Sequence, residues 1–315
     1  MKKPAKATSF RSLEERHAMI ITFGSINVDF VYEVEEMPQP GQTLLARRFR
    51  TESGGKGANQ ALAAARDGAE VVMVGAVGKD SLAEIGLQNL ATTADISRVA
   101  RVSEPTGNAS IHIDAKGRNM IVVAAGANLS VSSDAVEEDL LQQANVVLMQ
   151  MENDVAEVER LIRRASASKA LSILNLAPAF PLSEKILSLC GLVVVNEDEA
   201  EALAGWLGCG ASAAALSTRL GTGVLRTLGG DGAEACVDGD EIRVTALPID
   251  VKDTTAAGDC FVGVLASALD RGLPLKAAME RASVAAGIAC SRRGSQSSIP
   301  AAGETDRHPG LLALT

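Results

Sequence analysis

Aromatic residues are scarce in this chain of 315 residues: they make up 3% of it, with one Trp, one Tyr and six Phe. Hydrophobic residues nevertheless make up 47%, and the mean hydropathy is +0.14. The core must therefore be built mainly from Ala, Val, Leu and Ile, which suits helices that cover a buried sheet. The length permits one large α/β unit or two domains.

Cysteine and histidine are also few. The five cysteines (Cys190, Cys209, Cys236, Cys260 and Cys290) are odd in number and lack the close pairs of metal sites. We therefore expect reduced thiols in a cytoplasmic protein. Cys260 adjoins Asp259, but none of the three histidines lies in a motif-like setting, which disfavours a Cys-His nucleophile and a zinc site.

Positive charge is in deficit, with 30 Lys and Arg against 39 Asp and Glu and a formal net charge of −9. This balance disfavours nucleic acid or an anionic membrane as the main partner. No apolar run is long enough to cross a bilayer, and residues 1–18 contain no secretion signal. We expect 1–18 to be a disordered extension and 19–315 to be a single domain.

Two common nucleotide-binding motifs are absent. The chain has no P-loop with a GK[ST] ending, and no Gly-x-Gly-x-x-Gly follows the first predicted strand, 20–23. Asn27 and Asp29 follow that strand instead. A carboxylate there would repel pyrophosphate but would accept hydrogen bonds from neutral hydroxyls. This disfavours a dinucleotide-dependent dehydrogenase and favours a polyol ligand, although a loop or cap role also explains Asp29 alone.

Hydrophobic patterning alternates strands with helices along most of the chain. We expect strands over 71–74, 146–151, 171–174, 192–195 and 223–228, and helices over 58–67, 81–92, 155–166, 197–204 and 261–270. Such alternation predicts an α/β fold with a mainly parallel central sheet and helices on both faces.

Two segments break this alternation. Residues 42–51 and 107–123 look like strands without helices between them, and the second predicts a hairpin that turns at Lys116-Gly117. We expect them to form a small protruding β lid, with strands from about 30–53 and 103–124, over the carboxyl ends of the sheet. An ordinary surface hairpin is the alternative.

The run from Asp253 to Asp259 leads directly into a predicted helix. The first N–H groups of a helix are unpaired and attract phosphate oxygens, and the small residues Ala256, Ala257 and Gly258 let a ligand approach them. Asp259 would repel a phosphate unless it accepts a proton from a hydroxyl that attacks phosphorus. The alternative is an ordinary carboxylate in the first turn of a helix.

Other polar segments stand at predicted strand ends or helix starts. The glycine-rich segment 54–59 precedes a predicted helix. Its glycines indicate either a ligand-binding loop or a plain tight turn. Glu152 ends a strand. Asn196 and Glu199 share one helix face and suit hydrated Mg²⁺ and phosphate oxygens, although a plain helix cap has the same pattern. Segment 227–232 suits nucleotide contact or a hairpin.

Together these segments resemble the ribokinase-like (PfkB) carbohydrate kinase family. The matching segments, in the family's order, are 24–29, 54–61, 149–152, 196–201, 227–229 and 253–259, and they span roughly residues 19–300. Two positions depart from common family patterns: Ala256 stands where many members have Gly, and Ser283 stands near the expected adenine where some members have His.

The resemblance implies a role for each matching residue. Asp259 would be the catalytic base, and the amides around Ala256, Ala257 and Gly258 would form an anion hole. The implied sugar-binding residues are Asn27, Asp29, Gly55, Lys56, Asn59, Glu152 and Asp259. The implied nucleotide-binding residues are Asn196, Thr227, Gly229, Gly232, Gly258 and Ser283, with Glu199 for Mg²⁺ and phosphate. The implied ligands of a monovalent cation, usually K⁺, are Asp253, Thr255, Ala289, Arg292, Gly294 and Ser298, although 291–296 also reads as a basic surface turn.

The resemblance thus predicts an ATP-dependent sugar kinase. The form of segment 54–59 favours ribose as the acceptor, with deoxyribose, fructose, another sugar or a nucleoside such as adenosine as alternatives. A non-catalytic sugar-binding protein of the same fold is a further alternative, which the intact Asp259 and Glu199 disfavour. Lid strands have edges that a second lid can cover, so we expect a homodimer joined through the lids.

Overall fold

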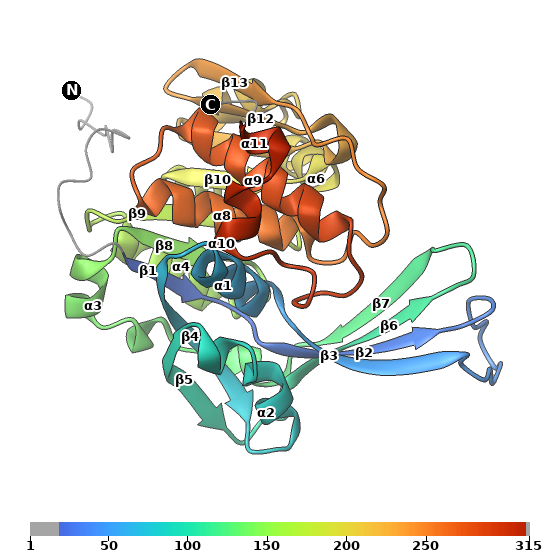
Figure 1. Cartoon of the computed structure of the whole chain (residues 1–315). Coiled ribbons are helices and arrows are strands. Elements are labelled where there is room, and N and C mark those ends of the chain that lie inside the picture. The colour runs from blue at the N-terminus through green and yellow to red at the C-terminus, as the bar shows by residue number, and fades with distance from the viewer. Residues whose placement is uncertain (1–18, 313–315) are drawn as a thin grey trace.

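The computed structural model describes residues 19–312, so the extension expected over 1–18 lies outside the described residues. The large sheet contains β1 (Met19–Phe23), β4 (Glu70–Gly78), β5 (Asp95–Val102), β8 (Val146–Met149), β9 (Leu171–Asn175), β10 (Leu192–Val195), β11 (Gly223–Thr227), β12 (Ala233–Val237) and β13 (Asp240–Val244). Their order is β13-β12-β11-β10-β9-β8-β1-β4-β5 (Figure 1). Pairing is parallel from β5 to β11, and β12 and β13 add an antiparallel edge hairpin. The expected mainly parallel sheet is confirmed.

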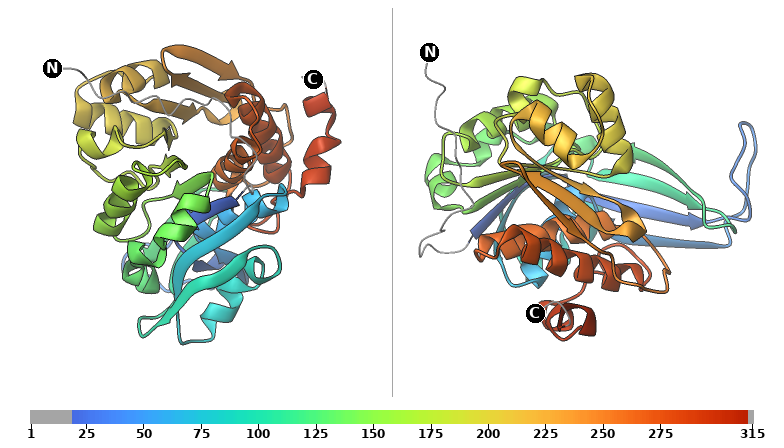
Figure 2. Two further views of the ribbon diagram at one scale, coloured as in Figure 1. Left: turned by 90° about the vertical axis from the view of Figure 1, so that its left-hand side faces the viewer. Right: turned by 90° about the horizontal axis from the view of Figure 1, so that it is seen from above.

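Helices cover both faces of this sheet (Figure 2). They are α1 (Lys56–Arg66), α2 (Leu82–Leu87), α3 (Glu138–Gln143), α4 (Val155–Ala165), α5 (Glu184–Leu187), α6 (Glu197–Leu207), α7 (Ala213–Leu220), α8 (Ala257–Asp270), α9 (Leu275–Cys290), α10 (Ala302–Asp306) and α11 (Pro309–Leu312). Short 3-10 helices are η1 (Leu90–Thr92), η2 (Gly126–Ser130), η3 (Ser133–Ala135) and η4 (Gly229–Asp231). Within residues 19–312, no helix has the length and apolar character needed to span a membrane.

Alternate residues of each central strand enter different cores, because successive side chains point to opposite faces. Ile20 and Leu148 pack in the core that holds α1, α8 and α9, whereas Ile21 and Met149 pack in the core that holds α4 and α6. Both faces are covered, so these strands read as continuous hydrophobic runs.

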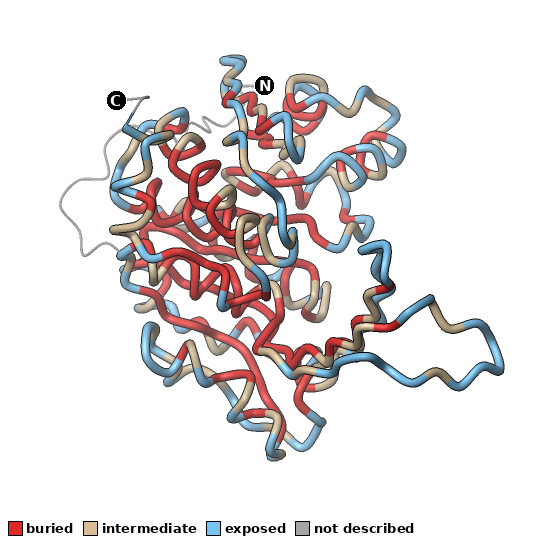
Figure 3. Tube along the Cα trace, turned by 45° about the vertical axis from the view of Figure 1, so that its right-hand side comes forward, coloured by how far each residue is buried: buried red, intermediate tan, exposed pale blue. Residues whose placement is uncertain are grey.

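A second, small sheet projects from the body of the molecule (Figures 1 and 3). It consists of β2 (Asn27–Glu33), β3 (Arg48–Gly54), β6 (Gly107–Ile113) and β7 (Asn119–Ala124), in the order β3-β2-β6-β7. We call this sheet the lid. Its strands differ from the expected ones at one end: Asn27 and Asp29 lie in β2, and the strand expected from residue 42 begins at Arg48. Residues 34–47 contain Pro38 and Pro40, which lack the N–H groups that a strand would donate.

Some of the predicted helix boundaries were also wrong. The helix expected over 81–92 divides into α2 and η1, and the helix expected from residue 261 begins at Ala257. Helix α9 and the β12–β13 hairpin were not predicted. Most residues of α9 are buried, so its sequence lacks the single apolar stripe that identifies a surface helix.

Helices α1 and α8 pack unusually closely. A Cβ atom built at Gly263 of α8 would lie 2.3 Å from the carbonyl oxygen of Gln60 and 2.6 Å from the Cβ of Ala63, both in α1. Only glycine fits this position without a shift of backbone. The two helices lie beside each other on one face of the large sheet (Figure 1).

We expect Gly263→Ala to lower the free energy of unfolding by about 1–3 kcal/mol, because the added methyl group must push the two helices apart. Urea denaturation followed by circular dichroism measures this change. The matched control is Gly205→Ala in α6, where an added Cβ meets no atom within 4 Å. That substitution should be neutral or stabilise the protein by up to about 1 kcal/mol. Equal effects of the two substitutions would contradict the packing constraint.

Candidate active site

Asp259 lies in the first turn of α8 and is buried, with 8% of its surface exposed. Its Oδ2 accepts a hydrogen bond from Nδ2 of Asn59 at 2.9 Å, and its Oδ1 accepts one from Nε2 of Gln60 at 2.9 Å. Both donors come from the first two turns of α1. The close contact of the helices therefore fixes both oxygens of the predicted base.

These two amides are themselves held by other buried amides. Gln60 Nε2 also donates to Oδ1 of Asn175 at 2.9 Å, and Gln60 Oε1 accepts from Nε2 of Gln150 at 2.7 Å. Asn59 Oδ1 accepts from Nε2 of Gln296 at 3.1 Å. The sequence assigned no role to Gln60, Asn175, Gln150 or Gln296. Gln60 and Gln150 lie inside segments 54–61 and 149–152, which carry the family resemblance. This position was the only sequence signal that could have identified them.

The predicted sugar-binding residues gather around the start of α1. Gly55 has φ 91°, and a Cβ built there would lie 2.7 Å from the backbone nitrogen of Asn27, so the glycine is required for this close approach. Glu152 Oε2 accepts hydrogen bonds from Oγ of Ser25 at 2.5 Å and from the amide of Lys56 at 3.1 Å. The structure thus brings Asn27, Gly55, Lys56 and Glu152 together.

Asn27 is oriented by a residue that the sequence did not identify. Its Oδ1 accepts a hydrogen bond from Nδ2 of Asn128 at 2.7 Å, and Oδ1 of Asn128 accepts one from the amide of Ile26 at 2.9 Å. Asn128 is fully buried in η2. The Nδ2 of Asn27 donates to no residue between 19 and 312, so it is available to a ligand.

Carboxylates dominate the charge of this region. Burial, followed by repulsion from Glu152, Glu52 and Asp259, raises the pKa of Asp29 to about 7. Attraction to Asp259 is the main cause that raises the pKa of Lys56, which therefore stays protonated. One ammonium group among several carboxyl groups suits a neutral ligand whose hydroxyls donate hydrogen bonds.

The predicted nucleotide-binding residues line two cavities that share Thr227 and Gly258. The first, of about 440 Å³, is also lined by Gly229, Gly232 and Ser283 and by apolar residues such as Leu247 and Pro248. The second, of about 220 Å³, is lined by Lys56, Asn196, Glu199 and Asp259 among others. Ser283 Oγ donates to the carbonyl oxygen of Thr245 at 3.0 Å. An adenine fits the first cavity, and phosphate groups directed toward Asp259 fit the second.

The amino terminus of α8 lies between these cavities and the base. Its N-cap, Ala256, has φ 58°, a left-handed conformation that glycine adopts more easily. The amide of Ala257 donates to the carbonyl oxygen of Thr254 at 3.2 Å. The amide of Gly258 donates to no residue that the structure describes, and a Cβ built there would meet no atom within 4 Å. Gly258 lines both cavities, so its unpaired N–H is available to a ligand there.

Asn196 and Glu199 form a capping box at the start of α6. The amide of Asn196 donates to Oε2 of Glu199 at 2.8 Å, and the amide of Glu199 donates to Oδ1 of Asn196 at 2.8 Å. Burial raises the pKa of Glu199. Its Oε1 receives no hydrogen bond from the described part of the chain. Glu199 thus offers one available carboxylate oxygen at the second cavity. A single such ligand suits a Mg²⁺ ion that keeps most of its water ligands.

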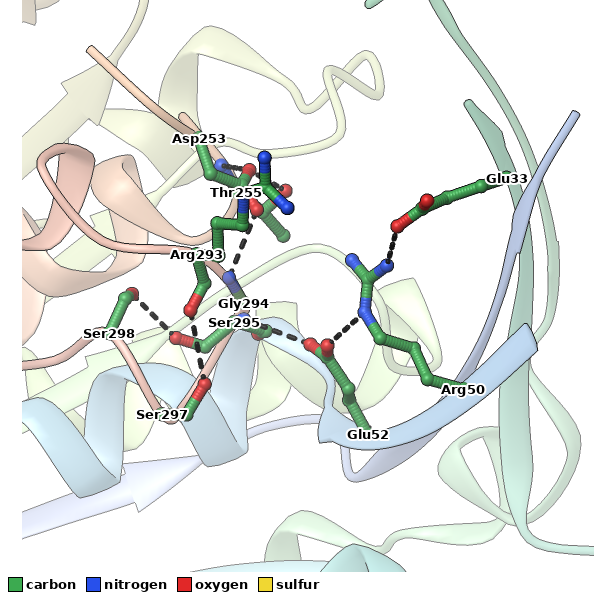
Figure 4. A network of polar contacts seen from close by, with 10 residues as sticks. All are labelled: Glu33, Arg50, Glu52, Asp253, Thr255, Arg293, Gly294, Ser295, Ser297 and Ser298. Carbon is green, nitrogen blue, oxygen red and sulfur yellow. Dashed lines mark hydrogen bonds and ion pairs between the residues drawn. The ribbon is translucent and has the colours of Figure 1, made fainter. Parts of the chain in front are cut away.

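The predicted cation ligands lie on two segments, 253–255 and 289–298. Asp253 joins these segments, and Figure 4 shows its bond to Gly294. Asp253 Oδ1 accepts from the amide and from Oγ1 of Thr255, at 2.9 and 2.6 Å, and Oδ2 accepts from the amide of Gly294 at 3.0 Å. Burial opposes ionisation, but these hydrogen bonds outweigh it and lower the pKa of Asp253. The carboxylate is therefore ionised at neutral pH.

Backbone carbonyls complete this set of oxygen atoms. The carbonyl oxygens of Arg292, Gly294 and Ser298 accept no hydrogen bond from residues 19–312, whereas that of Ala289 accepts from the amide of Arg292 at 3.0 Å. The guanidinium of Arg292 turns away to an ion pair with Glu304. Unpaired carbonyl oxygens on the segment that the ionised Asp253 binds through the Gly294 amide suit a hard monovalent cation.

The raised pKa of Asp29 predicts how stability depends on pH. The folded protein holds a proton that the unfolded chain releases above its ordinary pKa of 3.8, so stability falls as the pH rises from about 4 to about 7. We therefore expect the stability of Asp29→Asn, measured relative to the unsubstituted protein, to be about 2–3 kcal/mol greater at pH 8 than at pH 5. Urea denaturation at the two pH values measures this gain. The control is Asp240→Asn at an exposed position of β13; a gain of Asp29→Asn no larger than that of the control would contradict the assignment.

Comparisons with known proteins identify the family of the chain. A model of the pfkB family carbohydrate kinases matches residues 17–302. The chain is 36% identical over 295 residues to a ribokinase of Haemophilus influenzae, with 91% of this chain and 96% of that protein covered. It is 32% identical over 294 residues to a deoxyribokinase of Salmonella typhi, with 89% and 95% covered.

The fold has the same relatives. The structure of Arabidopsis thaliana ribokinase complexed with ribose and ATP superposes with a TM-score of 0.84 at 26% identity, covering 94% of this chain and 99% of that one. Family model, sequence and fold agree over nearly the whole length. The chain belongs to the pfkB family of carbohydrate kinases, which are phosphotransferases with an alcohol group as acceptor.

Proposed function

We propose that this protein is an ATP-dependent ribokinase that converts D-ribose and ATP to D-ribose 5-phosphate and ADP. The observation that carries the proposal is the position of Asp259, which two amides hold between a carboxylate-rich cluster and the nucleotide cavities. The similarity to ribokinases supports ribose as the acceptor.

In the proposed reaction, Asp259 accepts the proton of the sugar's primary hydroxyl as its oxygen attacks the γ-phosphorus of ATP. The new bond joins that oxygen to phosphorus, and the bond from phosphorus to the bridging oxygen of ADP breaks. The N–H of Gly258 and the amino terminus of α8 stabilise the charge on the transferred group, with Ala256 and Ala257 shaping the turn. Asn59 and Gln60 keep the carboxylate aimed at the hydroxyl.

The sugar would lie against the start of α1. Asp29 and Glu152 accept hydrogen bonds from its hydroxyls, Asn27 and Lys56 donate to its oxygens, and Gly55 lets the ring approach the backbone. Asn59 serves both the sugar and Asp259. This arrangement binds a neutral polyol and orients one hydroxyl toward the base.

Two ions fit the neighbouring residues. Glu199 would hold Mg²⁺ through water, with Asn196 fixing its carboxylate, and Mg²⁺ would neutralise charge on the phosphates. Asp253, Thr255 and the carbonyls of Ala289, Arg292, Gly294 and Ser298 would hold a monovalent cation, for which we propose K⁺. The described residues contain no disulfide, in keeping with the cytoplasmic location that we propose.

We expect Asp259→Asn to lower kcat by about 10²–10⁴-fold, because the amide cannot accept the proton, while binding of ATP persists. A coupled assay of ADP release measures kcat, and calorimetry measures binding. Asp240→Asn, at an exposed position of β13 that lines neither cavity, should retain full activity. Unchanged turnover by Asp259→Asn would exclude this residue as the base.

The similarity to a deoxyribokinase makes deoxyribose the strongest alternative acceptor. We expect ribose to give the highest kcat/KM in a panel with deoxyribose, fructose and adenosine under MgATP, with and without KCl. A higher value for another acceptor would replace ribose and leave the mechanism intact. Binding of sugars without any turnover would favour a non-catalytic protein.

We also propose a homodimer joined through the lids. Strand β7 is exposed along its whole length and lies at the edge of the lid, and its apolar residues Ile121, Val122 and Val123 are 51%, 62% and 48% exposed. A second lid would cover this apolar strand. Sedimentation should report twice the mass of the chain at micromolar concentration, and Val122→Lys should shift it to the monomer. A monomeric unsubstituted protein would contradict the dimer.

A further inference from the structure

One carboxylate connects the lid to the loop that carries the candidate cation site. Glu52 lies on β3, and its Oε2 accepts a hydrogen bond from the amide of Ser295 at 3.0 Å (Figure 4). Its Oε1 accepts from Nε of Arg50 at 2.5 Å, and Nη1 of Arg50 pairs with Oε1 of Glu33 at 2.9 Å. Only 19% of the Glu52 side chain is exposed. Arg50 thus holds the carboxylate in place toward residues 291–298.

The same loop reaches the predicted base through the next residue. Gln296 is 2% exposed, and its Nε2 donates to Oδ1 of Asn59 at 3.1 Å. Asn59 Nδ2 in turn donates to Oδ2 of Asp259 at 2.9 Å. Asn89 fixes the amide of Gln296, because Asn89 Nδ2 donates to Oε1 of Gln296 at 2.9 Å. An amide held at both ends cannot rotate without breaking one of these bonds.

Three consecutive residues therefore join three parts of the molecule. Gly294 is bound to Asp253 at the start of the segment leading to α8, Ser295 to Glu52 of the lid, and Gln296 to Asn59 beside the base. Gly294 has φ 94°, so the backbone turns sharply between these contacts. A shift of this loop away from the lid would move all three contacts.

We propose that Glu52 is a positioning residue that couples the lid to the catalytic base through Ser295, Gln296 and Asn59. The inference rests on the kinase function proposed above. Asp29, a predicted sugar ligand, lies directly opposite Glu52 in the β2–β3 pairing. A sugar that orders the start of β2 therefore also orders the neighbouring position on β3. The hydrogen bond from the Ser295 amide to a charged acceptor is the step that transmits this order to the loop.

The coupling predicts a specific pattern of hydrogen exchange. In the unsubstituted protein, ribose should slow exchange of amides in peptides that cover 291–298, although none of these residues is a predicted sugar ligand. In Glu52→Ala, ribose should still bind, but this slowing should be lost. The readout is independent of turnover, so it reports on the loop itself.

Activity should change in a matching way. We expect Glu52→Ala to lower kcat about tenfold, because Asn59 and Asp259 lose part of their fixed orientation, with less than a threefold change in the KM for ribose. Glu52→Gln keeps an oxygen that can accept from the Ser295 amide and should retain kcat within about threefold. The matched control is Glu35→Ala, in the segment that connects β2 to β3 of the lid, whose carboxylate forms an exposed ion pair with Arg47. The control should behave as the unsubstituted protein.

A double substitution tests whether the path is shared. If Glu52 acts through Gln296, then Glu52→Ala combined with Gln296→Ala should lower kcat little more than Gln296→Ala alone. Melting temperatures of all variants are measured together, so that activity is compared below the onset of unfolding.

Three results would overturn the coupling. A raised KM for ribose with unchanged kcat and unchanged exchange in 291–298 would make Glu52 a simple sugar contact. A lowered melting temperature with unchanged kcat would make its role purely structural. If the double variant lowered kcat by the product of the two single effects, Glu52 would act independently of Gln296. The unsubstituted protein is assayed first, so absence of sugar phosphorylation there would reject the proposed function itself, not the coupling alone.

Discussion

The close contact of α1 and α8 is the constraint on which the candidate site depends. Gly263 lets the two helices approach until an added methyl group would collide with the backbone of Gln60. At this separation, Asn59 and Gln60 of one helix reach both oxygens of Asp259 on the other. A wider spacing would leave the carboxylate buried without these partners, at a considerable cost in free energy.

The charges around Asp259 divide the candidate site into two halves that suit different ligands. On the lid side, burial and neighbouring carboxylates raise the pKa of Asp29, and the carboxyl groups outnumber the single ammonium of Lys56. This half repels anions and suits hydroxyl groups. On the other side, the amino terminus of α8 and the unpaired N–H of Gly258 suit phosphate groups. Asp259 lies at the boundary, where a hydroxyl and a phosphoryl group would meet.

Much of this arrangement was predictable from local sequence. The alternation of strands and helices predicted the parallel sheet. The family resemblance implied the nucleotide-binding roles of Asn196 and Thr227 and the role of Asp259, and these residues line one cavity. The register of the lid was less predictable, since Asn27 and Asp29 follow a buried strand and look like loop residues. Their pairing with β3, from Asn27 opposite Gly54 onward, places them in a strand of a different sheet.

The sequence by itself determined the fold class and the family, because the motifs that carry the resemblance stand at strand ends and helix starts, which depend on local backbone geometry. The roles of the site residues stay predictions that this resemblance implies. Only the tertiary structure decided which groups orient them. Gln60 is 199 residues away from its partner Asp259, and Gln296 is 237 residues away from its partner Asn59. Glu52 lies 243 residues from Ser295. No local pattern marks such contacts, because a buried amide or a lid carboxylate acquires its partner only when distant segments pack together.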